Sequence, residues 1–254
     1  MNIFYQQAAD FLALEPDFDV DAEVIHDTAC ILDLTPHIDA KMLGLNMWAS
    51  ASSMGYYPAT MSSAYQLSFN RIWGVYPFMK AVEAEFKRIF TTGKDPNAIA
   101  VEGIRLAMAG SASSLAQSTL RRALSVGGED FDYRKQCHFF LGRLARESGH
   151  FDEALRQYEL SEDSMRPRVF LEVGEVHASM NNRELAQQNF YMAGLGRHPD
   201  AWRRLADLEL GISMEEPDEA RRDEHSMRAL EWQKLHEYWK TTRQAPVRNS
   251  AVST

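Results

Sequence analysis

The residue pattern nearest to a reactive site in the N-terminal part pairs a histidine with a cysteine. His26 and Cys30 are four residues apart, so they share one face of a helix, and Asp27 is adjacent. Imidazole nitrogen and thiolate sulfur bind zinc, but a zinc site needs a third and a fourth ligand within reach. The nearby sequence offers none. A half-buried histidine beside a core cysteine is therefore the favoured interpretation.

Alternating acids just upstream follow the spacing of ligands in a calcium-binding loop. These acids are Asp17, Asp19, Asp21 and Glu23. A calcium loop needs glycine at its sixth position and a bidentate glutamate at its twelfth. Ala22 and Thr28 stand there instead. The acids are better explained as the start of a helix, and we predict no metal site.

The common sequence motifs of catalysis and cofactor binding do not occur in this chain. It contains no phosphate-binding glycine loop, no His-Glu-x-x-His zinc motif and no Gly-x-Ser-x-Gly nucleophile motif. We therefore predict a protein that is not an enzyme and binds no cofactor. A site assembled from scattered residues is the alternative, and converging acids and histidines with perturbed pKa values would reveal it.

Charge is distributed unevenly along the 254 residues, which carry a formal net charge of −9. Residues 1–40 contain nine acids and no lysine or arginine, so the remaining 27 acids balance all 27 bases. Such a segment repels nucleic acid and attracts basic surfaces, although a solvated helix face is the simpler explanation. The arginine pairs elsewhere are scattered, whereas nucleic-acid-binding proteins concentrate a basic face. We predict no nucleic-acid partner.

Cysteine content and hydropathy indicate the compartment. Cys30 and Cys137 are the only two cysteines, which makes no disulfide framework and suits a reducing environment. No apolar run approaches the roughly 20 residues that span a bilayer. Residues 1–14 lack the basic residues of a secretory or mitochondrial leader. We predict an intracellular, most simply cytoplasmic, protein without a membrane span; a processed N-terminus would leave mitochondria open.

Helical periodicity dominates the sequence and predicts an all-α protein. No strand alternation or hairpin signal interrupts it. Three glycine or asparagine pairs with a spacing of seven residues recur along the chain: Gly103 with Gly110, Gly142 with Gly149, and Gly174 with Asn181. The second member of each pair suits a left-handed helix stop. The first member lets two helices approach closely, so the pattern predicts repeated helical hairpins.

The hairpin around Gly142 resembles a tetratricopeptide repeat (TPR). Leu141-Gly142, Ala145, Gly149, Ala154 and Tyr158 fall at the spacing of that family. Gly174, Ala186 and Phe190 form a similar unit, a third begins at Trp202, and residues 42–59 resemble the looser Sel1 type. The resemblance implies a right-handed superhelical solenoid of antiparallel helix pairs.

Five segments follow from this pattern. Residues 1–35 form an acidic helical segment, and residues 36–95 form degenerate Sel1-like pairs. Residues 96–212 hold the TPR-like repeats, and residues 213–240 form a long helix that caps the array. This helix places Trp232, Leu235, His236 and Trp239 on one face, with Met227 and Leu230 outside it. Residues 241–254 form a disordered tail.

The resemblance implies a concave groove lined by the first helix of each pair. The residues carried over to that groove are Phe139, Arg143, Arg146, Arg168, Leu171, Glu175, Arg203 and Asp207. Its arginines suit forked hydrogen bonds to carboxylates, although a plain solvated face, with Arg143 paired to Glu147, remains open. The family's chaperone-tail clamp has Lys and Asn where Phe139 and Arg143 stand, so we do not predict a chaperone peptide as the ligand.

The predicted function is a non-enzymatic adaptor or assembly factor that binds a protein or peptide segment in this groove. Two alternatives are an accessory or regulatory domain of an enzyme complex and an RNA-binding helical repeat. The acidic residues 1–40 offer a further hypothesis, since they would fold onto an arginine-lined groove and occlude it. The partner and the oligomeric state are not determined by the sequence.

Overall fold

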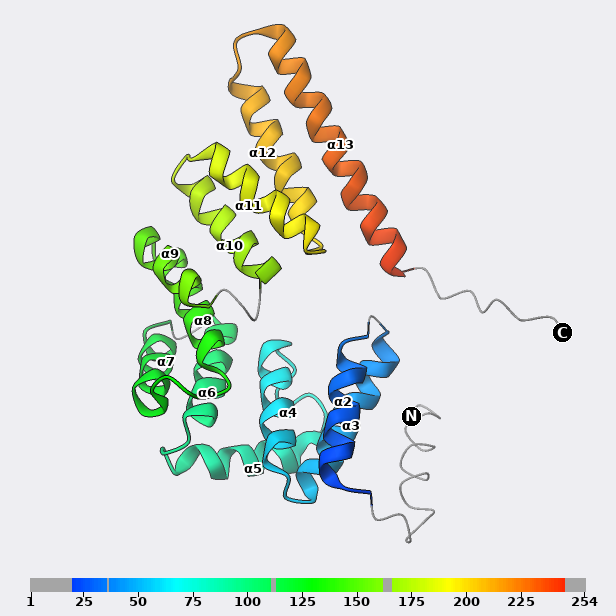
Figure 1. The fold of residues 1–254 in the computed structure, drawn as a ribbon, viewed down its shortest axis with the longest axis vertical. Helices are drawn as coiled ribbons and strands as arrows, with labels where there is room; N and C mark the ends of the chain where they lie inside the picture. The colour runs from blue at the N-terminus through cyan, green and yellow to red at the C-terminus, as the bar shows by residue number, and fades with distance from the viewer. Residues whose placement is uncertain (1–19, 36, 111–112, 162–165, 245–254) are drawn as a thin grey trace, which may run out of the picture. The chain divides into compact units, whose positions relative to one another are not determined.

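The computed structural model describes residues 20–35, 37–110, 113–161 and 166–244. Over these ranges the chain forms twelve α-helices and one 3-10 turn, with no strand, so the predicted all-α class is confirmed (Figure 1). The chain divides into two compact units, Met1–Arg134 and Lys135–Thr254. The sequence-based segment boundaries remain a prediction.

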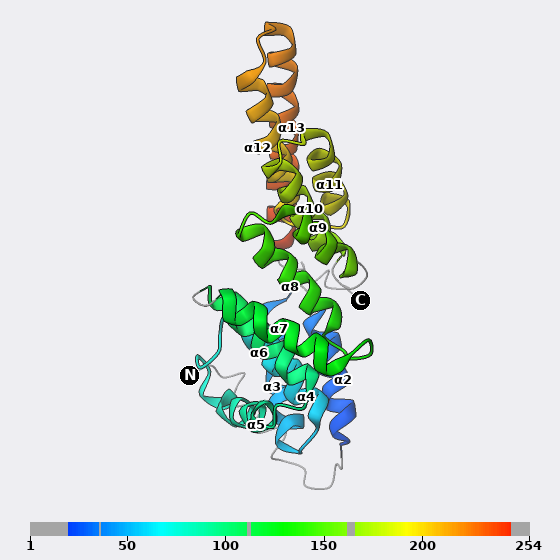
Figure 2. The same cartoon turned by 90° about the vertical axis from the view of Figure 1, so that its left-hand side faces the viewer.

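The first unit is a succession of helices in which each one packs against the next along the chain. The helices are α2 (Ala22–Asp33), α3 (Ile38–Ser53), α4 (Tyr57–Phe69), α5 (Lys80–Thr91), α6 (Pro96–Ala109) and α7 (Ser113–Gly127), with the 3-10 turn Pro77–Met79 before α5. In addition α4 contacts α6, and α6 lies beside α7 (Figure 2). Asp95 starts α6, because its side chain accepts the backbone N–H of Ala98 at 2.9 Å.

The second unit contains three helical hairpins. Its helices are α8 (Arg134–Glu147), α9 (Phe151–Leu160), α10 (Arg166–Ser179), α11 (Arg183–Leu195), α12 (Ala201–Glu215) and α13 (Glu219–Gln244). Neighbouring helices from α9 to α13 pack against one another in chain order. We call α8, α10 and α12 the A helices and α9, α11 and α13 the B helices.

Two turns of this unit use the same backbone conformation, a residue with positive φ just after the A helix. Gly149 has φ 77° and Asn181 has φ 57°, so both predicted left-handed positions are confirmed. After α8, the N–H of His150 donates to the carbonyl of Ala145 at 2.9 Å, and the N–H of Gly149 donates to the carbonyl of Arg146 at 2.9 Å. This crossed pair of bonds closes the helix end and reverses the chain.

Missing side chains set the distance between the helices of a hairpin. A Cβ at Gly142 would lie 2.8 Å from ring carbons of Tyr158, and one at Gly174 would lie 2.6 Å from ring carbons of Phe190. Both distances are far below van der Waals contact, so the predicted close approach at these glycines is confirmed. In the first unit, a Cβ at Gly103 would lie 2.7 Å from a methyl carbon of Leu120.

The last helix differs from the expectation in where it starts. We expected a helix over residues 213–240, but α12 continues through Glu215 and α13 begins only at Glu219. Pro217 lies in the link between them, where a proline interrupts no helical hydrogen bond. The helix then continues through Gln244, into the segment expected to be disordered, and residues 245–254 lie outside the described residues.

A buried carboxylate fastens α13 to the rest of the unit. Glu209 on α12 is 1% exposed. Its Oε1 accepts from Gln187 Nε2 at 2.9 Å, and its Oε2 lies 2.7 Å from His225 Nδ1. Nearby, the rings of Trp202 and Trp232 stack with centroids 5.5 Å apart. The final helix is therefore held by a polar contact as well as by apolar burial.

Alanine at Gly174 tests the close approach of α10 and α11. We expect Gly174→Ala to lower the free energy of unfolding by about 1–3 kcal/mol, because the new methyl group meets the ring of Phe190. The matched control is Gly211→Ala on α12, where a Cβ meets no heavy atom within 4 Å. That change should raise stability by about 0.5–1 kcal/mol. Equal effects in urea unfolding would contradict the packing.

Candidate functional site

Charged side chains connect the three A helices in a continuous ladder. Arg146 Nε on α8 lies 2.9 Å from Glu172 Oε2 on α10. Arg204 Nε on α12 lies 2.5 Å from Glu175 Oε1 on α10, and Arg204 Nη1 lies 4.0 Å from Asp207 Oδ2. We call these five residues the A-helix ladder. Because ion pairs join α8 to α10 and α10 to α12, the A helices present one shared surface.

The centre of the ladder is half-buried and its edges are exposed. Side-chain exposure is 25% for Arg146, 17% for Glu172 and 19% for Glu175, but 54% for Asp207. Tyr158 contacts the centre of the ladder from the core. Its hydroxyl donates to Glu172 Oε2 at 3.3 Å, and its ring is fully buried. Burial and the Glu172 carboxylate raise the pKa of that hydroxyl, so it remains a donor.

Two buried atoms of the ladder make ion pairs whose angles are not those of a hydrogen bond. Arg146 Nε and Glu175 Oε1 are buried, and neither has a hydrogen-bond partner among the described residues. Each of these atoms nevertheless lies against an opposite charge, Arg146 Nε against Glu172 and Glu175 Oε1 against Arg204. Burial also raises the pKa of Glu175, against the opposing effect of the Arg204 and Arg146 guanidinium groups. The centre of the ladder is thus held by ion pairs in a half-buried setting.

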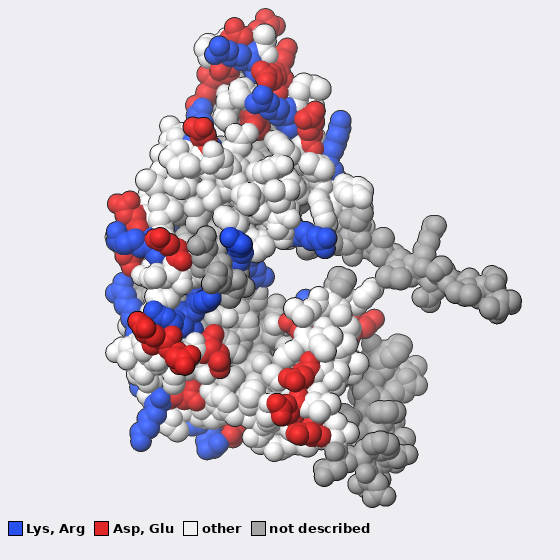
Figure 3. Space-filling model, viewed as in Figure 1, with Lys and Arg blue, Asp and Glu red and all other residues white. Residues whose placement is uncertain are grey.

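The charges of the ladder nearly cancel, which changes the expected character of the surface. Within the ladder two arginines face two glutamates and one aspartate, so both arginines are paired with carboxylates. Figure 3 shows basic and acidic side chains interspersed over the second unit, whereas acidic side chains without basic ones cover the part of the first unit that holds α2. A partner for the ladder would need both signs of charge.

Four further predicted groove residues lie on the A helices and differ in their exposure and in their partners. Arg143 Nε donates to Glu147 Oε1 at 3.0 Å, which is the intrahelical pair that the sequence left open. Arg203 is 49% exposed at its side chain and lies 3.8 Å from Asp200. Arg168 is half-buried near the start of α10. Leu171, also half-buried, packs against the apolar cluster that contains Trp202.

Phe139 lies in the core and not on the surface that the A helices present. It is 4% exposed and packs edge-on against Phe140 with ring centroids 5.3 Å apart and against Tyr158 at 5.9 Å. Successive helical residues are rotated by about 100°, so an assignment that is wrong by one position turns a surface residue into a core residue. Phe139 is therefore a correction to the predicted groove residues, because its ring is part of the core.

Sequence reasoning missed two members of the ladder, Glu172 and Arg204. Each is adjacent in sequence to a residue that was assigned to the groove, Leu171 and Arg203 respectively. The signal available in the sequence is opposite charge on successive A helices, because Arg146, Glu172 and Arg204 stand on α8, α10 and α12. That signal requires the register between hairpins to be known first.

His26 joins helices rather than forming a metal site. Its Nε2 lies 3.1 Å from Ser62 Oγ on α4, and its Nδ1 lies 3.1 Å from Asp27 Oδ1. Serine, histidine and aspartate in this order resemble a nucleophile with its base. However, Ser62 lies in the interior of α4, where helical bonds occupy the backbone N–H groups that would stabilise an oxyanion. We assign this trio the role of linking α2 to α4.

Comparison with family models, with curated proteins and with solved structures finds no match for this chain. Among the described residues, no group of three or more histidine, cysteine, aspartate or glutamate side chains is placed to hold a metal ion. No helix in the described ranges combines the length and the apolar character needed to cross a membrane. The choice of the A-helix ladder as the candidate site therefore rests on its geometry alone.

The burial of Glu175 predicts a pH dependence of stability. Because its folded-state pKa is raised, the folded protein binds more protons than the unfolded chain between the ordinary glutamate pKa of about 4.3 and that raised value. The free energy of unfolding should therefore fall as pH rises through this window. In Glu175→Gln this part of the decline should disappear, which urea unfolding from pH 4 to pH 8 measures.

The control for this experiment is Glu184→Gln, which alters an exposed acid on α11. Its unfolding curve should follow that of the unmodified protein at each pH. If the stability of the unmodified protein rises relative to Glu175→Gln as pH increases from 4, the sign is reversed. In that case the pairing with Arg204 outweighs the burial of the carboxylate.

Proposed function

We propose that this chain is a non-enzymatic adaptor of the helical-repeat class, similar to TPR and Sel1 proteins, that binds a protein segment along its A helices. The recurrent hairpin turn at Gly149 and Asn181 and the glycine contacts at Gly142 and Gly174 support the repeat assignment. A superhelical solenoid is the arrangement that such repeats build when they stack. The concave surfaces of such arrays are used for binding, which supports an adaptor.

The A-helix ladder is the observation that carries this proposal. Helices that pack only for stability do not require charged groups in a half-buried seam, because apolar residues fill such a seam without a desolvation cost. Here Arg146, Glu172 and Glu175 occupy it and leave two polar atoms without hydrogen bonds. A partner that supplies donors and acceptors to these side chains would be held by charge-assisted hydrogen bonds, which are stronger than neutral ones.

The expected partner is a protein segment that carries both acidic and basic side chains. The edge residues Arg143, Arg203 and Asp207 would meet it first, and the half-buried pairs would exchange partners with it. Since such pairs act over a limited distance in salt solution, binding should weaken as ionic strength rises.

Alanine substitutions on the two sides of the hairpins test this proposal. The A variant carries Arg143→Ala, Arg203→Ala and Asp207→Ala. The B variant carries Arg156→Ala, Arg183→Ala and Glu184→Ala on α9 and α11, and it removes the same charges. Both should fold, because alanine is a good helix former and none of the six side chains is buried.

Proteins captured from an extract of the native source by the full chain identify the partner, which is then titrated with each purified variant. We expect the A variant to bind at least about tenfold more weakly, a loss of about 1.4 kcal/mol, and the B variant to bind as the unmodified chain does. Equal binding by both variants would move the interface away from the A helices. If the intact chain retains no protein, the adaptor function is contradicted.

A further inference from the structure

The inner face of the last helix, α13, packs against the rest of the second unit. Ala229 is 2% exposed, and Trp232 stacks on Trp202. His225 contacts the buried Glu209, and His236 Nδ1 lies 3.0 Å from the carbonyl oxygen of Pro199. At about 100° per residue, these four side chains occupy one side of the helix. This side holds α13 against α12.

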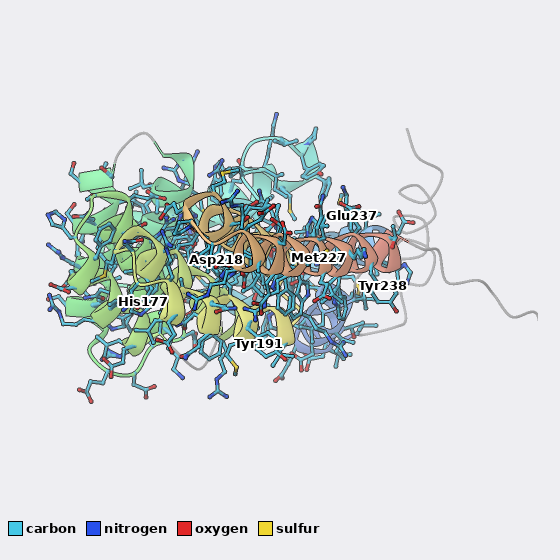
Figure 4. The ribbon with its side chains drawn as sticks, turned by 90° about the horizontal axis from the view of Figure 1, so that it is seen from above. His177, Tyr191, Asp218, Met227, Glu237 and Tyr238 are labelled. Atoms are coloured by element: carbon cyan, nitrogen blue, oxygen red, sulfur yellow. The ribbon has the colours of Figure 1, made fainter. Side chains whose placement is uncertain are left out.

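The opposite face of α13 carries large apolar side chains that remain exposed. Met227 is 58% exposed and Tyr238 is 61% exposed, and Figure 4 shows both along this helix. Glu231 and Lys234, also exposed, lie between them on the same face. We call these four residues the outer stripe. Leu230 and Leu235, exposed by 50% and 37%, flank the stripe on either side.

The outer stripe has a charged middle and one apolar residue at each end, and these two ends are unusual for a helix at the end of a repeat array. Terminal helices of such arrays keep a polar outer face, because no further repeat covers them. Here the stripe extends over twelve residues, from Met227 to Tyr238, which is about 16 Å of helix at 1.5 Å per residue. Its spacing of four, three and four residues is that of a seam between two packed helices.

We infer that α13 pairs with α13 of a second copy of this chain, in antiparallel orientation about a two-fold axis. The centre of the outer stripe lies between Trp232 and Gln233. A two-fold axis there places every residue opposite the residue equally distant on the other side of the centre. Met227 of one copy then packs on Tyr238 of the other, and Glu231 lies opposite Lys234.

Charge complementarity selects this arrangement. In the antiparallel dimer the two central layers hold two Glu231–Lys234 pairs, one from each direction. A parallel pairing of the same stripes places Glu231 against Glu231 and Lys234 against Lys234, and like charges in contact are destabilising. The stripe is therefore complementary to itself in one direction only. This inference concerns the outer face of α13 and does not depend on the A-helix ladder.

The dimer should be weak. One helix pair of this length buries less than the roughly 1,600 Å² of a standard protein interface. We therefore expect a dissociation constant on the order of 10–100 μM, in the range of transient association. Sedimentation equilibrium of the full chain at protein concentrations around this value should resolve monomer and dimer.

A charge swap distinguishes this dimer from general apolar adhesion. Lys234→Glu places acid against acid twice in the antiparallel dimer, so association should weaken about tenfold or more. Glu231→Lys should weaken it similarly. The double variant Glu231→Lys with Lys234→Glu restores two opposite-charge pairs and should recover the affinity of the unmodified chain. The control Lys240→Glu makes the same charge change on α13 outside the stripe and should have little effect.

Cysteine cross-linking tests the orientation directly. In a Cys30→Ser background, Met227→Cys and Tyr238→Cys chains are mixed and oxidised. Antiparallel pairing brings these two positions together, so a mixed disulfide dimer should form, whereas Met227→Cys alone should form little because its copies lie at opposite ends of the stripe. A chain that stays monomeric above about 500 μM, or a dimer unaffected by the single charge reversals, would overturn the proposal.

Discussion

The close approach of two helices at a glycine is the contact on which the second unit depends. At Gly142 and Gly174 an aromatic ring from the B helix occupies the space that a side chain would otherwise fill. Interiors of proteins are packed too densely for this distance to vary much. The ring therefore fixes the separation of each hairpin, and the left-handed residues Gly149 and Asn181 fix its direction.

This fixed spacing brings the A helices within reach of one another through their side chains. Tyr158 belongs to both arrangements, because its ring packs at Gly142 and its hydroxyl reaches Glu172 on the following A helix. The ion pairs from Arg146 to Glu172 and from Glu175 to Arg204 follow from the same geometry. The positions of the surface charges thus depend on the packing inside each hairpin.

The final helix combines two different demands. Its inner face docks onto the unit, where the buried Glu209 contacts side chains from both α11 and α13. A carboxylate buried in this way is costly unless its partners are in place, so it specifies how α13 docks. Its outer face keeps Met227 and Tyr238 exposed, which is the basis of the proposed contact with a second copy.

Local chemistry in the sequence determined the helices, the left-handed turn residues and the glycine contacts, because each depends on residues close together along the chain. Only the tertiary structure decided which charges meet. Arg146 and Glu172 belong to different hairpins, so their pairing depends on how those hairpins stack. The same reason explains Phe139, which the repeat pattern assigned to the groove but which the packing of Phe140 and Tyr158 places in the core. A rotation of 100° per residue leaves surface assignments undetermined until a neighbouring helix defines which side is buried.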